Sequence, residues 1–521
     1  MSLSIHSAAS SPADEPSLGS FRDPRTFVRV FVGAFLRDVH SFYPGCRMES
    51  IPAPLGVRTA KTAGEPPEPG DGIGFEMTDE DDDRTTAVWV SLFGTWHRLV
   101  PERPLGLGAQ DRRLIRAVAA VLELNFQILF RRSRMSILQL RRGMPEDHYV
   151  AACLEPSAYA PTAWASSRIA EAILTLRTMA LSTYENRRVS TGALILGAAG
   201  DHPDEGRRST SAEAIQFGAE LTSLKSLQRL CDGRRTVFLI DRAGKLADVV
   251  DVQRWADRDD GSTGGEKSTA PGPDVPCARI YAAHARATRS GGDVCLVLSP
   301  NQEIKVFADG MQAFVFAHGR WRALDVESKF AVWREALANP RLARVLFQAA
   351  LDLAEERQGG LLVVVVDPSR AVGRLLDPRD VVDFEAEPEA EPEPSPGRES
   401  GPALYVVDPW DATAAGEPPV VDSLTKRSIH YLAGSRSLLT LDASVVEALA
   451  SLDGALVADG DGRLLAFGAI LRHDALSRPQ TMAEGARTTA AIVASRFGPV
   501  LKVSEDGIVS CFLDGVRVWD L

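Results

Sequence analysis

The chain has 521 residues, with 70 acidic and 58 basic side chains and a formal net charge of −12. An acidic balance of this size excludes a dedicated binder of long duplex nucleic acid, which needs a basic surface to neutralise phosphates. The hydrophobic fraction of 45% and the charged fraction of 25% are typical of globular domains and exclude wholesale disorder. At about 150 residues per domain, the length predicts three to four domains.

Cysteine usage and the apolar segments indicate the compartment. The six cysteines lie far apart and form no C-x-x-C pair, which argues against a disulfide scaffold or a zinc module and favours a reducing compartment. The start of the chain lacks the apolar segment of a signal peptide. The longest aliphatic run, Leu361–Val366, is too short to span a bilayer. We therefore expect a cytoplasmic protein without membrane contact.

The N-terminal part predicts a tail followed by a small α+β domain. Residues 1–24 are rich in Ser, Ala and Pro and are expected to be disordered, and the domain is expected over residues 25–155. Apolar residues at helical spacing predict helices over Pro24–Tyr43 and Asp111–Arg132. Alternation of apolar and polar residues over Thr86–Leu99 predicts a strand or hairpin. No motif in this domain carries recognisable chemistry.

Two further regions, residues 160–327 and 328–521, show the same order of predicted elements. In both, a helix leads to a buried strand, then to a short helix, a pair of strands and a last helix followed by strands. The pattern x-A-R-x-x-A-A recurs at the start of the last helix, in Cys277–Ala283 and Gly485–Ala491. An internal duplication explains the agreement, although any two α/β units share a helix–strand rhythm. The second region also carries an insert of alternating Glu and Pro at 385–402, which predicts a solvated loop.

The stretch from Leu452 to Leu513 has the clearest chemical pattern. Asp453-Gly-Ala455 begins an apolar strand, Gly485-Ala-Arg-Thr-Thr489 begins a helix, and Val503-Ser-Glu-Asp-Gly507 precedes the last strands. An Asp at a strand end can hold a divalent metal or accept a proton from a ribose hydroxyl. A helix N-terminus that carries an arginine suits a phosphate group, because its N–H groups and the guanidinium are positive.

Each of these motifs also has an ordinary structural interpretation. Asp453 is explained equally well as a turn residue, Arg487 as one half of a surface salt bridge, and residues 505–507 as a simple hairpin turn. The functional interpretation therefore depends on the order and spacing of the motifs taken together.

In their order, and with the upstream segment Arg357–Val365, these motifs resemble the diadenylate cyclase (DAC) domain family over most of residues 341–518. The family pattern is D-G-A on one strand, G-[TS]-R-H-R-x-A at a helix start and V-S-E-x-x-G before the last strands. The resemblance implies an α/β fold with a mixed central sheet flanked by helices, and ATP or a cyclic dinucleotide as ligand. The nucleotide-binding residues that it implies are Asp453, Gly454, Ala455, Gly485, Arg487, Thr488, Thr489, Ser504 and Glu505.

The chain departs from the family at the helix start, where Arg487-Thr488-Thr489 stands in place of R-H-R. Phosphoryl transfer depends on positioning and on stabilising charge, so this loss is expected to cost several orders of magnitude in rate, by analogy with about 10³–10⁵ for an arginine finger. The sequence therefore favours a nucleotide or cyclic-dinucleotide sensor in bacterial signalling or conflict systems, acting on an unidentified effector protein.

Two alternatives stay open. The first is an active diadenylate cyclase that condenses two ATP to cyclic di-AMP; the resemblance implies that its catalytic Asp453 would orient the 3′-hydroxyl and hold Mg²⁺ or Mn²⁺. The second is a scaffold that keeps the fold without a ligand. The Thr488-Thr489 replacement favours the sensor over the cyclase, and the intact Asp453-Gly-Ala455 favours either over the scaffold.

The first of the two related regions reads as a degenerate DAC-like unit. It aligns Arg235-Thr-Val237 with Asp453-Gly-Ala455 and Arg279 with Arg487. DAC domains resemble half-sites that face each other, so a tandem pair implies an intrachain pseudo-dimer. With a carboxylate in one copy alone, such a pair could not run two symmetrical transfers, which again favours sensing.

Overall fold

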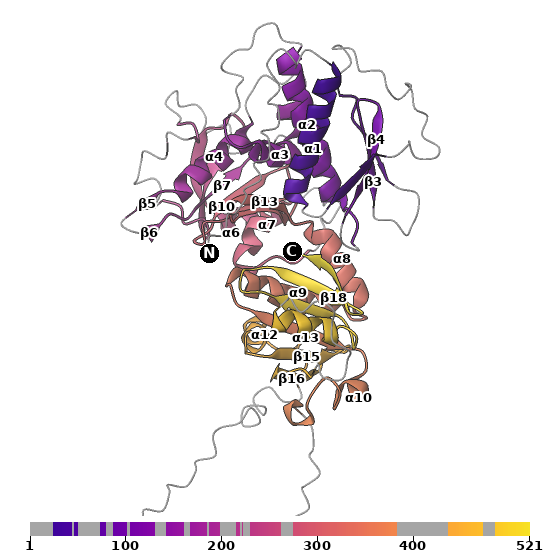
Figure 1. The fold of residues 1–521 in the computed structure, drawn as a ribbon. Coiled ribbons are helices and arrows are strands. Elements are labelled where there is room, and N and C mark those ends of the chain that lie inside the picture. The colour runs from indigo at the N-terminus through magenta and orange to yellow at the C-terminus, as the bar shows by residue number, and fades with distance from the viewer. Residues whose placement is uncertain are drawn as a thin grey trace, which may run out of the picture. The chain divides into compact units, whose positions relative to one another are not determined.

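The computed structural model of the chain describes residues 24–43, 46–50, 73–79, 87–101, 105–130, 142–160, 167–184, 187–197, 215–218, 221, 230–261, 275–382, 436–472 and 485–521. Nearly all of the predicted tail, the insert at 385–402 and most of a short helix expected at 224–230 lie outside these residues. The chain divides into two compact units, residues 1–331 with residue 521 and residues 332–520, and each is described by itself (Figure 1).

Two helices and a small antiparallel sheet form the N-terminal part of the first unit, as the sequence predicts. Their bounds are α1 (Pro24–Phe42), α2 (Ala109–Phe130), β1 (Arg47–Ser50), β2 (Glu76–Asp79), β3 (Val88–Leu92) and β4 (Thr95–Val100). The strands lie in the order β1-β4-β3-β2, and β3 and β4 form the predicted hairpin. All five residues of β3 are buried, and Val88, Val90 and Leu92 pack in one apolar cluster with residues of α1 and α2.

A seven-stranded mixed sheet makes up most of the rest of the first unit. Its strands are β7 (Thr191–Ile195), β8 (Thr236–Ile240), β9 (Leu246–Asp251), β10 (Val294–Leu298), β11 (Ile304–Ala308), β12 (Met311–Ala317) and β13 (Arg320–Ala323). They lie in the order β13-β12-β11-β10-β7-β8-β9, and the β7–β8 pair is parallel whereas the other neighbours are antiparallel.

Helices lie on both faces of this sheet. The remaining elements of the unit are α3 (Pro145–Leu154), η3 (Pro156–Tyr159), α4 (Arg168–Ala180), α6 (Val252–Gly261), η6 (Arg279–Tyr281), α7 (Ala282–Arg286) and the short strands β5 (Thr183–Tyr184) and β6 (Arg187–Arg188). Val306 packs in the same cluster as α4, while the next residue, Phe307, points to the opposite face and contacts Tyr281 and His284.

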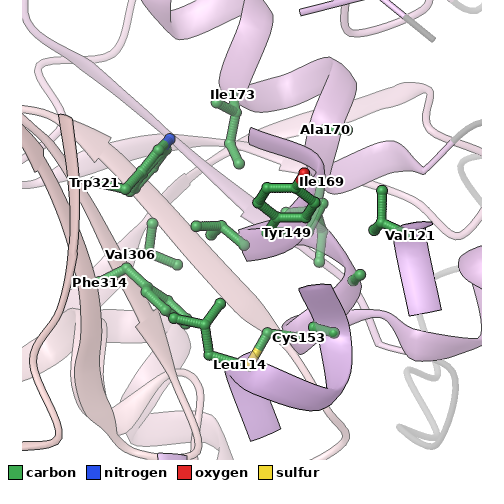
Figure 2. Close-up of a cluster of buried hydrophobic side chains, with 14 of the residues drawn as sticks. Leu114, Val121, Tyr149, Cys153, Ile169, Ala170, Ile173, Val306, Phe314 and Trp321 are labelled. Carbon is green, nitrogen blue, oxygen red and sulfur yellow. The ribbon is translucent and has the colours of Figure 1, made fainter. Parts of the chain in front are cut away.

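One apolar core joins the N-terminal helices to the large sheet. Figure 2 shows side chains from α2, α3 and α4 facing the sheet. Those labelled are Leu114, Val121, Tyr149, Cys153, Ile169, Ala170, Ile173, Val306, Phe314 and Trp321. Residues expected in a separate N-terminal domain therefore share their hydrophobic cluster with the sheet that follows.

A buried carboxylate, Asp147, links three elements of this core. Asp147 is 1% exposed and accepts hydrogen bonds from Arg177 Nη1 at 2.8 and 3.0 Å and from Trp321 Nε1 at 2.8 Å. The backbone N–H of Met144 donates a further bond at 3.1 Å. A buried charge persists only where it is paired and hydrogen-bonded, so Asp147 fixes the arrangement of α3, α4 and β13.

We expect Asp147→Ala to lower the free energy of unfolding by about 2–3 kcal/mol, because Arg177 and Trp321 would lose their acceptor in a buried position. Urea unfolding followed by circular dichroism measures the change. Glu76→Ala removes an exposed carboxylate from the same unit and serves as the control. A loss from Asp147→Ala no larger than that from the control would contradict the structural role.

A six-stranded mixed sheet forms the second unit. Its strands are β14 (Gly360–Val365), β15 (Ala455–Asp459), β16 (Leu464–Ala469), β17 (Val500–Val503), β18 (Val509–Leu513) and β19 (Val516–Asp520). Its helices are α9 (Pro340–Glu355), α10 (Pro368–Ala371), η7 (Pro378–Asp380), α12 (Ala443–Ala450) and α13 (Ala486–Ala494), and α8 (Val326–Ala336) contains the unit boundary. The strand order is β16-β15-β14-β17-β18-β19. The α/β class with mixed sheets flanked by helices is therefore confirmed.

The central strand β14 is buried along its whole length because helices cover both faces of the sheet. Leu361, Val363 and Val365 pack in one cluster with Ala491 and Ala494 of α13. On the other face, α9 and α12 approach so closely that a Cβ on Gly360 would lie 2.8 Å from Leu353 and 2.9 Å from the Ala450 carbonyl. The apolar run that the sequence predicts as a strand is thus the middle of the sheet.

The two large sheets have the same strand order. β9-β8-β7-β10-β11-β12 in the first unit corresponds to β16-β15-β14-β17-β18-β19 in the second, with the parallel pair at the same place and β13 as an addition. The connecting turns also agree. Asp241 accepts from the N–H groups two and four residues later, as Asp459 does, and each turn has a glycine at positive φ, Gly244 and Gly462.

Candidate functional site

Strand register brings the predicted residues to one end of the sheet in the second unit. Gly360, the first residue of β14, lies opposite Val503 of the antiparallel β17. The parallel pairing of β14 with β15 places the same residue level with Gly454. Asp453 precedes β15 and Ser504 follows β17, so both side chains leave the sheet at this end. Two motifs that are distant in the sequence therefore lie at the same end of this sheet.

Arg487 of α13 reaches the same end of the sheet. A Cβ on Gly359, just before β14, would lie 2.2 Å from Arg487 Nη1, so the guanidinium rests against that backbone. The ion pair from Arg487 to Glu505 spans 3.9 Å, and the two side chains are 35% and 78% exposed. An exposed pair at this distance contributes little free energy. The guanidinium can therefore exchange Glu505 for an anionic ligand at small cost.

The first turn of α13 carries the two threonines. Gly485 is the N-cap and makes no side-chain cap, and its carbonyl accepts from the N–H groups of Thr488 and Thr489 at 2.9 and 3.2 Å. Thr488 is 5% exposed, and its Oγ1 accepts a hydrogen bond from Lys502 Nζ at 3.0 Å. Lys502 is not among the residues predicted from the sequence, although it is the single charged residue in the apolar strand V-L-K-V.

Asp453 is an exposed carboxylate that makes no hydrogen bond or ion pair with the residues the structure describes. Its neighbour Gly454 has φ +113°, and a Cβ there would lie 2.4 Å from the carbonyl carbon of Gly468 and 2.8 Å from Ala469 N. A glycine is therefore required for β15 to start this close to β16. Ala455, by contrast, is 1% exposed and packs in the core.

The turn after β17 holds Ser504 and Glu505 in place. Ser504 Oγ bonds to the Asp506 carboxylate and to the Ile508 carbonyl, the latter at 3.1 Å. Arg357 Nη1 donates to the Asp506 carbonyl, which ties the turn to the end of α9. Partial burial raises the pKa of Asp506, but the bond from Ser504 and the charge of Lys502 outweigh it and lower the pKa overall. Asp506 therefore stays ionised and fixes the turn.

We expect Gly454→Ala to lower the free energy of unfolding by about 1–3 kcal/mol, because the methyl group meets the β16 backbone and the positive φ is strained for alanine. The substitution also displaces Asp453, so binding of any ligand at this end should weaken. Gly460→Ala in the same hairpin is the control, since no atom lies within 4 Å of a Cβ there. Equal melting temperatures for the two variants would contradict this account.

The same strand register identifies the equivalent residues of the first unit. Leu298 and Val503 each precede a serine, and each lies opposite the first residue of the central strand. In the parallel pairs, the first residue of each central strand is level with Thr236 in the first unit and with Gly454 in the second. The residues just before these, Arg235 and Asp453, therefore match. The alignment made from the sequence and the register of the two sheets therefore agree at this position.

Aromatic side chains fill the equivalent helix start in the first unit. Tyr281 corresponds to Thr489, is fully buried, and packs against His284 and Phe307 with ring centroids 5.3 and 5.4 Å away. His284 Nε2 bonds to the Gly233 carbonyl at 2.9 Å. Burial lowers the pKa of His284 to about 4, so its ring is neutral near pH 7. This surface is packed as a core, whereas the second unit presents polar groups.

A buried pair of carboxyl groups lies elsewhere in the first unit and was not indicated by the sequence. Asp111, 7% exposed, accepts from Tyr43 Oη at 2.7 Å and from the Gly108 N–H at 3.0 Å. Asp325 is 3% exposed and lies so close to Gly108 that a Cβ there would be 2.0 Å from its Oδ2. Burial, and then the charge of Asp325, raise the pKa of Asp111 to about 6, against the opposing charge of Lys329.

This pair predicts a pH dependence of stability. The pKa of an aspartate in the unfolded chain is about 4, so the folded state binds the proton more tightly. The stabilisation is fully present below about pH 4 and is lost as pH rises through about 6, a total of about 3 kcal/mol. Urea unfolding of the native chain and of Asp111→Asn at pH 5 and pH 7.5 measures it, and the native chain should lose more. The same loss in both proteins would contradict the assignment.

A cavity of about 70 Å³ lies in the first unit beside Asp325 and Arg113, and not at the predicted site. Within the described ranges, no three His, Cys, Asp or Glu side chains gather as a preformed metal site. None of the helices described here is long and apolar enough to cross a membrane.

Comparisons with known proteins do not identify a family. No protein-family model matches the sequence, and a search of the curated proteins found no match. A similar solved structure is described as that of a hypothetical membrane spanning protein from Bacillus cereus. It is 16% identical, the match covers 37% of this chain and 70% of that one, and the TM-score is 0.22. A TM-score this low carries no argument about fold or function.

Proposed function

We propose that the second unit binds a nucleotide or a cyclic dinucleotide and that the protein is a sensor for this ligand. The observation that carries the proposal is the meeting of Asp453, Arg487, Thr488 and Ser504 at one end of a single sheet. Ligands of α/β proteins commonly bind where strand ends meet a helix N-terminus. The chain would then pass the signal to an unidentified effector protein.

We further propose that the two large sheets arose by duplication of a DAC-like unit. Their common strand order supports this, as do the matched turns at Asp241 and Asp459. The hairpins β11–β12 and β18–β19 add a third agreement, because each turns through an Asp-Gly pair with both residues at positive φ, at Asp309 and at Asp514. The pairing of the two units with each other stays a prediction.

The polar groups of the second unit suit the separate parts of a nucleotide. Arg487 and the N–H groups that open α13 would hold phosphate oxygens, with Thr488 and Thr489 adding hydroxyls. The exposed carboxylate of Asp453 would accept a bond from a ribose hydroxyl. Mg²⁺ commonly binds to one or two carboxylates together with substrate phosphates and water. Asp453 fits a Mg²⁺ or Mn²⁺ ion that arrives with the ligand.

Sensing is favoured over synthesis by the asymmetry of the two units. Asp453 has Arg235 as its counterpart, and the first unit fills its equivalent helix start with Tyr281 and His284. Two symmetrical transfers would need a carboxylate and an anion site in both copies. One polar site and one packed core are instead consistent with a single binding event.

The test is binding and turnover measured on the whole chain. We expect ATP or cyclic di-AMP to raise the melting temperature in the presence of Mn²⁺, with a dissociation constant measurable by calorimetry. Asp453→Asn should remove most of the affinity, whereas Arg235→Ala, at the matched position of the first unit, should change it little. Labelled ATP followed by chromatography reports any product.

Three outcomes would count against the proposal. Formation of cyclic di-AMP by the native chain, lost in Asp453→Asn, would establish the cyclase instead. Equal losses of affinity from Asp453→Asn and Arg235→Ala would contradict the asymmetry. No thermal shift with ATP, cyclic di-AMP or another cyclic dinucleotide would leave a scaffold without a ligand.

A further inference from the structure

We propose that Lys502 is a second phosphate-binding cation of this site and sets its affinity for the phosphate chain of the ligand. The inference rests on the proposed function and extends it. In the proposed function Arg487, at the start of α13, is the cation that binds phosphate, and the inference adds a second cation from β17. Lys502 belongs to none of the motifs by which the site was predicted.

The position of Lys502 follows from strand register. Lys502 lies opposite Leu361 of β14, and cross-strand partners point to the same face of a sheet. Leu361 packs in the cluster that contains Ala491 of α13, so Lys502 also points toward this helix. Its Nζ meets Thr488 Oγ1 at 3.0 Å. The ammonium therefore lies beside the first turn of α13, on the side from which β17 approaches.

The bond to Thr488 orients both groups toward an anion. An ammonium has no acceptor, so the hydroxyl must accept this bond and keeps its own proton as a donor. A phosphate oxygen near the helix start would meet that hydroxyl, the N–H groups of Ala486 and Arg487 and the charge of Lys502. Arg487 lies one residue before Thr488 and supplies a second positive charge. Together these groups form a clamp with two cations.

The first unit shows that the fold does not require this pair. The position of Lys502 is held there by Val297, which lies opposite Gly192 and is 1% exposed. The position of Thr488 is held by Ile280. A buried valine and an isoleucine that is 38% exposed stand at these two positions, so a sheet of the same order forms without a Lys–Thr contact. The lysine–threonine pair occurs in the unit that also carries Asp453, which points to a ligand rather than to stability.

The experiment compares the intact chain with single substitutions of Lys502. Lys502→Met removes the charge and keeps the length of the side chain, and Lys502→Arg keeps the charge. Arg370→Met is the matched control, because Arg370 follows β14 at the other end of the sheet. Calorimetry with ATP, inorganic tripolyphosphate and adenosine separates the phosphate chain from the nucleoside.

We expect Lys502→Met to weaken the binding of ATP and of tripolyphosphate about 10- to 100-fold, which is the usual effect of losing a hydrogen bond to a charged group. The affinity of Lys502→Arg for both ligands should stay within a few-fold of that of the native chain, and the affinity of Arg370→Met should equal it. Adenosine should bind with the same affinity to all four proteins. If Lys502→Met fails to fold, the double substitution Lys502→Val with Thr488→Ile, which copies the first unit, takes its place.

The results separate this inference from the proposed function. Native affinity for ATP in Lys502→Met would overturn the role of Lys502 and leave nucleotide binding intact. If tripolyphosphate binds in a way that depends on Lys502, and ATP binds no more tightly than tripolyphosphate, the result would support the clamp and count against a nucleotide ligand. No binding of ATP, tripolyphosphate or cyclic di-AMP by the native chain would overturn both.

Discussion

The hydrogen-bonding register of β14 is the constraint on which the candidate site depends. This strand pairs in parallel with β15 and antiparallel with β17, so the start of one neighbour and the end of the other lie at the same edge. The close approach of Leu353 and of the Ala450 carbonyl to Gly360 favours that register, because a slip of one residue would place a side chain where only a glycine fits. Asp453 and Ser504 owe their proximity to this pairing and not to a contact of their own.

Much of this arrangement could be predicted from the sequence. Apolar runs identified the strands, and the shared order of elements with the recurrence of A-R-x-x-A-A gave an alignment that the strand register reproduces at Arg235 and Asp453. These signals are local, and each is a short pattern along the chain. Lys502 was missed because its role depends on which face of β17 it occupies, and therefore on Leu361 in another strand.

The carboxyl pair of the first unit was missed for the same reason. Asp111 and Asp325 are each ordinary in their own segment, and nothing along the chain indicates that both approach Gly108. Burial changes their chemistry, because a charge that costs little on the surface becomes expensive when desolvated. The raised pKa of Asp111 is thus a property of the folded core, which alternation and helical periodicity do not encode.

The net charge of −12 describes the chain as a whole and not this edge of the sheet. Arg487, Lys502 and the open N–H groups of α13 gather positive potential within one helical turn, and charges separated by more than about 10 Å are largely screened at physiological salt. Glu505 and Asp506 are opposing charges in the adjoining turn. The charge of Lys502 lowers the pKa of Asp506, and the long, exposed pair of Glu505 with Arg487 costs little to break. An anion that enters would therefore displace a weak contact and gain two stronger ones, which is why an acidic protein can still carry a phosphate site.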